Sequence, residues 1–175
     1  DPASGDVYLP MPLGPAMKQE LPDVKNFVRI REAWDESYVK VNGEVDRLKV
    51  SYADRQLFSM FSFKLLSGNK ATALSGLQNI VLAESVAKRL FGNDDPIGQT
   101  IEVKLEDGFR SFTVSAVAAD VPSNSSIRFE ALANFDYLAI TPNGKRSVNN
   151  WKRSSYFTYV ELKPGSKLPA DPDAL

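Results

Sequence analysis

The sequence contains no cysteine and no histidine among its 175 residues. Without histidine the chain lacks the commonest general base, the commonest ligand of transition metals and the usual pH-sensitive side chain. The absence of both residues excludes zinc sites of the cysteine and histidine kind, and also Ser-His and Cys-His nucleophile pairs. It excludes disulfides too, which is compatible with a bacterial periplasm without establishing it.

An excess of basic charge is also lacking, since 21 Lys and Arg residues face 22 Asp and Glu residues. The net charge of −1 argues against a nucleic-acid partner and against a simple electrostatic membrane anchor. No apolar run approaches the roughly 20 residues that span a bilayer, and no signal peptide is present. Glycine-rich phosphate loops are missing as well, so we expect no ATP hydrolysis and no cofactor in this chain.

The two ends suggest a piece of a longer protein. The sequence begins with Asp1 rather than methionine, and Asp171 followed by Pro172 is typical of a helix start. A natural protein rarely ends where a helix begins, so we expect both ends to be cuts in a larger chain.

What is present fits one domain, or two small lobes built on one continuous core. Hydrophobic residues make up 43% of the chain and charged residues 25%, which is ordinary for a globular protein and argues against disorder. The local patterns predict an α+β fold without repeats, with mixed sheets and short helices. The expected strands include residues 24–31, 100–105, 111–119 and 156–162.

Turn and capping signals refine this picture. Asn42-Gly43 predicts a β-hairpin between the alternating segment Tyr38–Val41 and a return strand at Leu48–Tyr52. Asp54 is expected to be the N-cap of a short helix that runs to Met60. Residues 141–150 are expected to form a loop.

The clearest predicted helix is Glu84–Phe91. Val86 and Leu90, and likewise Ala87 and Phe91, are spaced i, i+4 on one face, which we expect to be buried. Lys88 and Arg89 should then face solvent. Gly92 is expected to end the helix in a left-handed conformation.

From Ser51 to Asn134 the sequence resembles the periplasmic core domain of MacB-type and FtsX-like ABC transporter permeases. The order and spacing of several blocks together carry the resemblance, and the stretch from Glu84 to Gly98 is its most specific part. The blocks are Tyr52-Ala53-Asp54 with Phe58, Phe61 to Asn69, Ile80 to Gly92, Asp95 to Thr100, Phe112 to Val117, and Asp120 to Ser125.

The resemblance implies a domain on the periplasmic side of the bacterial inner membrane, between the first two transmembrane helices of a permease. It implies two lobes: a membrane-proximal lobe of residues 1–52 with 155–175, and an inserted lobe of residues 53–154. The implied partners are an ABC ATPase, a second permease copy in a homodimer, and a periplasmic adaptor or envelope protein.

The expected function is therefore non-catalytic. The domain would relay ATP-driven motion to substrate export, as in efflux, or to an envelope partner. The alternative is a periplasmic binding module that itself captures a peptide, a lipid or a glycan, and its distinguishing feature would be an exposed apolar pocket.

Four local patterns allow a functional interpretation beside a structural one. Phe58, Phe61 and Phe63 could form a hydrophobic substrate surface, but aromatic side chains favour core packing. Asp94 and Asp95 could bind a cation, but adjacent aspartates in a turn more often cap it. In a third pattern, Ser85 and Lys88 have the S-x-x-K spacing of a Ser-Lys nucleophile, without its partner motifs.

The fourth pattern is Trp151 between basic residues. Lys152 and Arg153 follow it directly, and Lys145 and Arg146 precede it. These residues fit a solvated loop, and the alternative is contact with an acidic partner or with lipid headgroups. Trp151, Lys152 and Arg153 form the one candidate surface for a partner or substrate. We expect no catalytic, cofactor-binding or metal-binding residues.

Overall fold

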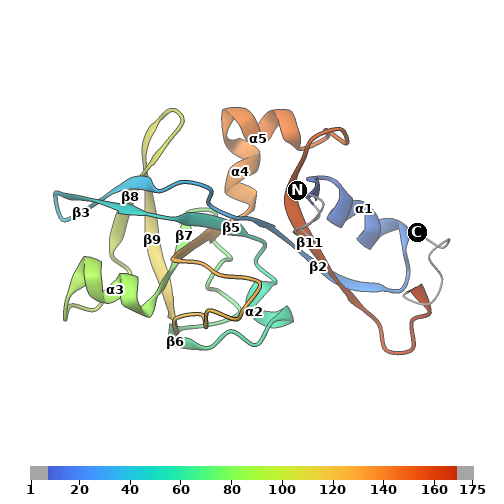
Figure 1. Cartoon of the computed structure of the whole chain (residues 1–175), viewed down its shortest axis with the longest axis horizontal. Coiled ribbons are helices and arrows are strands. Elements are labelled where there is room, and N and C mark those ends of the chain that lie inside the picture. Colours follow the sequence, from blue (N-terminus) through green and yellow to red (C-terminus); the bar gives the residue numbers. More distant parts are fainter. Residues whose placement is uncertain (1–7, 169–175) are drawn as a thin grey trace.

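All the strands in residues 8–168, the part of the chain that the computed structural model describes, belong to one mixed sheet (Figure 1). The strand order is β1-β11-β2-β5-β10-β7-β9-β8-β3-β4, and β6 pairs with β9 beside this path. Only the β5–β10 and β7–β9 pairs are parallel, which confirms the predicted α+β class with a mixed sheet. The helix start expected at Asp171-Pro172 lies outside the described residues.

One edge of the sheet is made from the beginning and the end of the described chain. Strand β2 (Val24–Arg31) pairs antiparallel with the last strand, β11 (Ser154–Leu162), which also pairs with β1 (Leu9–Pro10). Helix α1 (Leu13–Glu20) packs on this edge, with Gly14 against the Phe27 ring. Both ends of the described chain therefore reach the same side of the molecule (Figure 1).

The centre of the sheet carries apolar side chains on both faces. It consists of β5 (Val50–Ala53), β10 (Ala131–Asn134), β7 (Asn79–Ala83) and β9 (Gly108–Ala118). Along β7, the neighbours Ile80 and Leu82 belong to one core cluster and Val81 to the other. Burial on both faces explains why this strand reads as a continuous apolar run rather than an alternating one.

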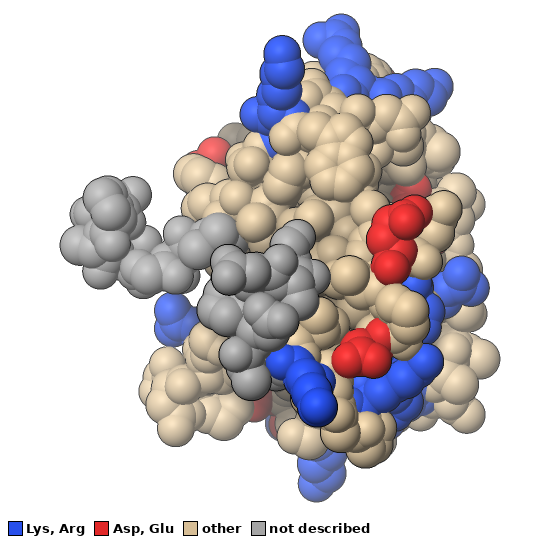
Figure 2. Space-filling model, turned by 90° about the vertical axis from the view of Figure 1, so that its right-hand side faces the viewer, with Lys and Arg blue, Asp and Glu red and all other residues tan. Residues whose placement is uncertain are grey.

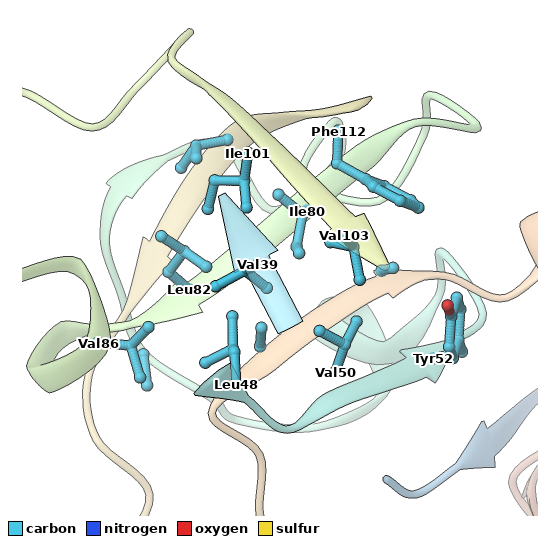
Figure 3. Packing of buried hydrophobic residues seen from close by; sticks show 14 of the residues in the cluster. Val39, Leu48, Val50, Tyr52, Ile80, Leu82, Val86, Ile101, Val103 and Phe112 are labelled. Atoms are coloured by element: carbon cyan, nitrogen blue, oxygen red, sulfur yellow. The ribbon is translucent and has the colours of Figure 1, made fainter. Parts of the chain in front are cut away.

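The far edge consists of β8 (Thr100–Leu105), β3 (Ser37–Val41) and β4 (Glu44–Leu48), and β6 spans Leu65–Gly68. Val39 and Leu48 share the larger core cluster with Val50 of the central strands (Figure 3). Strands so far apart in the order meet only if the sheet curls over its own inner face. The β3–β4 hairpin thus pairs with β8, which lies in the range predicted for the inserted lobe. Its own residues lie inside 1–52, the range predicted for the membrane-proximal lobe.

The predicted turn at Asn42-Gly43 is confirmed, since both residues have positive φ (51° and 87°), as a tight two-residue hairpin turn requires. The predicted return strand is wrong. The turn fixes the register Val41–Glu44, so the return strand is Glu44–Leu48. Residues 50–53 form β5, which pairs with β2 and β10 instead.

Helix α3 (Glu84–Phe91) has the predicted bounds and orientation. Val86, Ala87 and Phe91 are buried, and Leu90 packs half-buried against the same cluster. Lys88 and Arg89 are on the outer side, paired with Glu84 and with Asp46 of β4 respectively.

Gly92 ends helix α3 at φ 60° and ψ −116°. The positive φ agrees with the prediction, whereas ψ lies outside the left-handed helical region.

The other helices differ from the predicted ones. Helix α2 spans only Leu57–Met60, and Asp54 is not its N-cap because its carboxylate binds Arg29. Residues 141–150 are not a simple loop. Helix α5 (Pro142–Ser147) follows α4 (Asp136–Ile140), and the Thr141 hydroxyl caps it by accepting a hydrogen bond from the Gly144 amide.

Helix α5 packs closely on α4. A Cβ at Gly144 would lie 1.5 Å from the Leu138 carbonyl oxygen, so only glycine fits at this corner.

Candidate functional site

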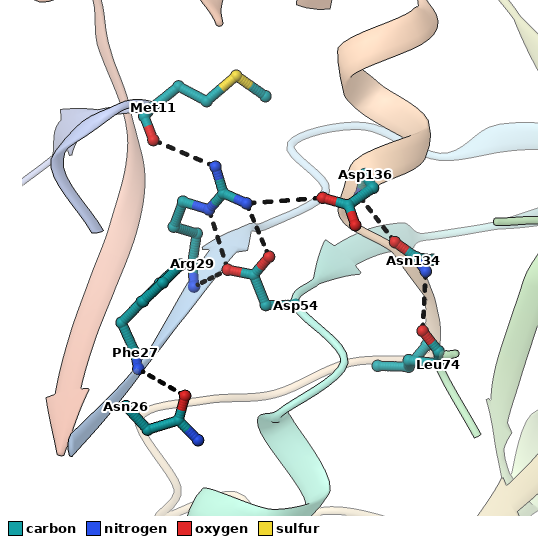
Figure 4. Close-up of polar contacts among 8 residues, drawn as sticks. All are labelled: Met11, Asn26, Phe27, Arg29, Asp54, Leu74, Asn134 and Asp136. Atoms are coloured by element: carbon teal, nitrogen blue, oxygen red, sulfur yellow. Dashed lines mark hydrogen bonds and ion pairs between the residues drawn. The ribbon is translucent and has the colours of Figure 1, made fainter. Parts of the chain in front are cut away.

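A buried ion pair joins the edge that carries both chain ends to the rest of the sheet (Figure 4). The Arg29 side chain of β2 donates two hydrogen bonds to the Asp54 carboxylate, from Nε at 2.9 Å and from a terminal nitrogen at 2.8 Å. The side chains are only 11% and 7% exposed. This bidentate geometry fixes the relative orientation of the two side chains as well as their distance. We call the pair the Arg29–Asp54 clamp.

The backbone reinforces the clamp in both directions. The Arg29 amide donates to the Asp54 carboxylate at 2.7 Å, and the Asp54 amide donates to the Arg29 carbonyl at 3.1 Å. Ladder pairing between β2 and β5 covers only Ile30–Ala53 and Arg31–Tyr52. Because the ladder is so short, the clamp supplies much of the direct connection between these two strands.

The guanidinium of Arg29 also contacts three further groups. It donates to the Met11 carbonyl at 3.3 Å and lies 3.7 Å from the Asp136 carboxylate (Figure 4). It also lies 4.2 Å from the centre of the Phe135 ring. Asn134 accepts from the Asp136 amide and donates to the Leu74 carbonyl. One side chain of β2 thus contacts β5, the start of α4 and the segment before α1.

A polar cleft of about 620 Å³ opens beside the clamp. Its walls come from the β2–β3 connection, the β8–β9 turn, helices α4 and α5, and the start of β11. Charged residues of both signs line it together with aromatic rings: Arg31, Glu32, Trp34, Tyr52, Lys104, Glu106, Arg153 and Tyr156. The volume suits a small ligand, and the mixture of charges suits a polar or zwitterionic ligand better than an apolar one.

Tyr52 links this cleft to the core, and burial raises its pKa to about 12, partly opposed by the positive charge of Arg31. In the unfolded chain the phenol ionises near pH 10. Between about pH 10 and pH 12 the unfolded state therefore loses a proton that the folded state keeps, and stability falls as pH rises.

We expect the free energy of unfolding to drop by about 2–3 kcal/mol across this window because of Tyr52. Urea denaturation at a series of alkaline pH values measures the drop. Tyr52→Phe should remove most of it, while Tyr38→Phe, at a half-exposed tyrosine, should leave it in place. An unchanged slope in Tyr52→Phe would show that other groups cause the loss.

In the structure, Ser85 and Lys88 each bind another side chain. The Ser85 hydroxyl donates to Asp120 at 2.8 Å, and the Lys88 ammonium binds Glu84 at 2.7 Å. That hydrogen bond raises the pKa of Lys88, so the amine stays protonated and is not free to accept a proton. Ser85 and Lys88 therefore do not form the Ser-Lys pair that their spacing would allow.

Asp95 of the 93–98 turn acts as the structural interpretation predicted. The Asp95 carboxylate accepts from the Ile97 amide at 3.0 Å. Within residues 8–168, no three acidic side chains gather as metal ligands would.

The aromatic residues of the 58–63 segment divide between core and surface. Phe58 is fully buried, as expected for core packing. Phe61 and Phe63 are half-buried, and with Tyr159, Val121 and other residues they line an apolar groove of about 520 Å³.

Trp151, Lys152 and Arg153 lie in the turn between α5 and β11, and all three are exposed. Arg153 lines the polar cleft, and the other two do not. Sequence reasoning missed Arg29 and Trp34. The available signals were an arginine inside a predicted strand and a tryptophan three residues after the end of that strand, and both occur in many unrelated settings.

No helix among residues 8–168 has the length and apolar character needed to cross a bilayer. A search of curated proteins finds no match. By contrast, residues 2–175 match the family described as MacB-like periplasmic core domain.

Solved structures with the same fold agree. A domain of a putative permease protein from Porphyromonas gingivalis superposes with a TM-score of 0.80 at 26% identity, covering 97% of this chain and 76% of that one. The periplasmic region of MacB from Actinobacillus actinomycetemcomitans gives a TM-score of 0.67 at 15% identity, covering 97% and 72%.

A third structure is the extracellular domain of the noncanonic ABC-type transporter YknZ from Gram-positive bacteria. It superposes with a TM-score of 0.60 at 14% identity, covering 94% of this chain and 85% of that one. At the identities of the last two structures, the likeness concerns the fold alone.

Proposed function

The chain belongs to the family of MacB-like periplasmic core domains, and from this premise we propose that it relays ATP-driven motion within an ABC transporter permease. The observation that carries the proposal is the position of the Arg29–Asp54 clamp. Both ends of the described chain reach one edge of the sheet, and a short ladder with one buried ion pair connects that edge to the rest.

In this proposal the membrane-proximal lobe comprises residues 1–52 with 155–175, and the inserted lobe comprises residues 53–154. Displacement of transmembrane segments would enter at β1, β2 and β11. Within the first range, the β3–β4 hairpin packs on β8 of the inserted lobe. Residues 32–36 would then connect the two sides covalently, parallel to the clamp.

The clamp suits this role because its geometry resists both separation and rotation. Two hydrogen bonds between planar groups hold the strands at a fixed angle, and burial protects the ion pair from screening by salt. Motion of β2 would be passed to β5 rather than absorbed by the side chains.

The proposed partners follow from the family. An ABC ATPase, on the same chain or another, would supply the energy, and a second permease copy would complete a homodimer in the bacterial inner membrane. The domain would act on the periplasmic side, without chemistry of its own, on export of a substrate or on a periplasmic adaptor. The complete protein should then contain apolar segments of roughly 20 residues on both sides of this chain.

Spin-label distances between the two copies in the parent transporter test the relay. Because this chain has no cysteine, Lys163→Cys and Val45→Cys give single labels within it, both at exposed positions. Residue 163 follows β11 at the edge that carries both ends of the described chain, and residue 45 lies on the β3–β4 hairpin that pairs with β8 of the inserted lobe. A non-hydrolysable ATP analogue should change both distances. No change at residue 45 in the otherwise unmodified transporter would contradict the relay.

Weakening the clamp should separate the two responses. Asp54→Asn should preserve the change at residue 163 and broaden or abolish the change at residue 45. Glu161→Gln is the matched control, because it weakens the exposed Lys25–Glu161 pair within the membrane-proximal edge. If Asp54→Asn and Glu161→Gln change the two distances equally, the clamp does not transmit the motion.

The polar cleft favours a second candidate, a binding module that captures its own ligand. Trp34 is 68% exposed at the cleft wall and offers a stacking surface for a peptide or a glycan. Calorimetric titration of this chain with peptide, lipid and glycan panels tests it. Saturable binding that Trp34→Ala abolishes would support the candidate, and no saturable binding across the panels would contradict it.

A further inference from the structure

The four basic residues around Trp151 form a local concentration of charge that the net charge of the chain hides. Lys145, Arg146, Lys152 and Arg153 fall within nine positions, and no acidic residue occurs anywhere from 137 to 160. A segment with four positive charges and no negative ones, in a chain of net charge −1, is separated from its counter-charges in sequence.

The separation persists in space. All four side chains belong to exposed residues, and none forms an ion pair with another described residue. By contrast, Lys25, Lys88, Arg89 and Arg110 are paired with carboxylates. Figure 2, which faces the side where both chain ends lie, shows Lys and Arg at the upper end, where Figure 1 places α5.

Apolar side chains are exposed among these charges. Trp151 is 55% exposed and Val148 is 37% exposed, and Ile140 at the end of α4 is 49% exposed. We call Lys145, Arg146, Val148, Trp151, Lys152 and Arg153 the basic–aromatic patch. Tryptophan beside lysine and arginine is the combination favoured where a bilayer meets water, since its ring is apolar and its N–H is polar.

The position of the patch in the fold brings it to the side where the chain would meet the membrane. Strand β11 begins at Ser154, directly after Arg153, and Ser154 pairs with Pro10 of the first strand. The patch is therefore adjacent to the beginning of the described chain. The tight α4–α5 corner at Gly144 holds α5 at this location.

We propose that the basic–aromatic patch binds anionic lipid headgroups of the bilayer surface beside the transporter. This assignment rests on the proposed function, because it takes the edge with both chain ends as the membrane-facing side. An acidic protein segment would satisfy the four cations equally well. It would not explain why Trp151, Val148 and Ile140 are exposed beside them.

The energetics suit a tethered contact. Each Lys or Arg near an anionic surface strengthens binding about fivefold, so four act together strongly at low salt. In the transporter the domain is already held near the bilayer, so a weak contact is sufficient to orient it.

Binding of this chain to vesicles tests the proposal directly, without ATP or a parent transporter. In a Trp34→Phe background, Trp151 is the only tryptophan of the chain and reports its own surroundings by fluorescence. Mixed phosphatidylglycerol and phosphatidylcholine vesicles should shift its emission to the blue, and added salt should reverse the shift. Pure phosphatidylcholine vesicles should give little or no shift.

Charge removal supplies the matched comparison. Lys152→Gln with Arg153→Gln should weaken the vesicle partition coefficient by about 25-fold, at roughly fivefold per charge. The control is Lys64→Gln with Lys70→Gln, which removes the same charge at exposed positions next to β6, at the opposite end of the view in Figure 1. This control should change the vesicle partition coefficient little. Equal losses in the two variants would overturn the assignment to the patch.

Two other outcomes also overturn it. One is the absence of a shift with phosphatidylglycerol vesicles at low salt. The other is saturable binding of a soluble polyglutamate peptide without vesicle binding, which would assign the patch to an acidic protein partner instead. Neither result bears on the spin-label test, so a failure of the lipid contact can be distinguished from a failure of the relay.

Discussion

Asp54→Ala is expected to lower the free energy of unfolding by about 3–5 kcal/mol, as for other buried ion pairs that lose one partner. The substitution leaves the Arg29 guanidinium, whose side chain is only 11% exposed, without its main counter-charge. It also removes the acceptor of the Arg29 amide. Asp136, at 3.7 Å and with a side chain 60% exposed, is too distant and too well solvated to replace it.

Urea denaturation measures this loss, and the pair Lys25–Glu161 provides the control. Its atoms are 2.7 Å apart, but its side chains are 58% and 35% exposed. Glu161→Ala should therefore cost no more than about 1 kcal/mol. If Asp54→Ala costs as little as Glu161→Ala, the clamp contributes no more than a surface pair, and the relay loses its structural basis.

Phe91→Ala is expected to destabilise the domain by about 3–5 kcal/mol. The ring is 8% exposed and belongs to the larger core cluster, together with Val86 and Ala87 of the same helix. Its removal would leave a cavity at the end of α3 and would detach the last turn from the sheet.

Thermal or urea unfolding of the variant measures the loss against Lys88→Ala. Lys88 is on the solvent side of α3 and pairs with Glu84, so its replacement should leave stability almost unchanged. A small effect of Phe91→Ala would mean that the ring is accessible in solution. The end of α3 would then be better explained as part of an interface.

Features that depend on neighbours in sequence were predictable. The Asn42-Gly43 turn and helix Glu84–Phe91 are both determined by local conformation and by a periodic apolar face, and the structure has both. Helix α5 was missed, although Thr141 before Pro142 is a capping residue followed by the favoured first helical residue. The glycine and polar residues that follow obscured that signal.

Features that depend on strand adjacency were not predictable. Asp54 has the sequence context of an N-cap, and only the placement of β5 beside β2 brings it to Arg29. The return strand of the hairpin was shifted because the turn, rather than the apolar stretch after it, sets the register. Of the candidate surface, sequence identified Trp151, Lys152 and Arg153, but their exposure and lack of ion pairs required the fold.

The pairing of β2 with β11 has a consequence for biogenesis. These strands are more than a hundred residues apart in sequence, so one edge of β2 has no hydrogen-bonding partner until β11 has been synthesised and exported. An unpaired strand edge is a template for aggregation. We therefore expect the nascent domain to depend on periplasmic chaperones until its last strand arrives, and truncations before Ser154 to be degraded rather than to accumulate as a folded lobe.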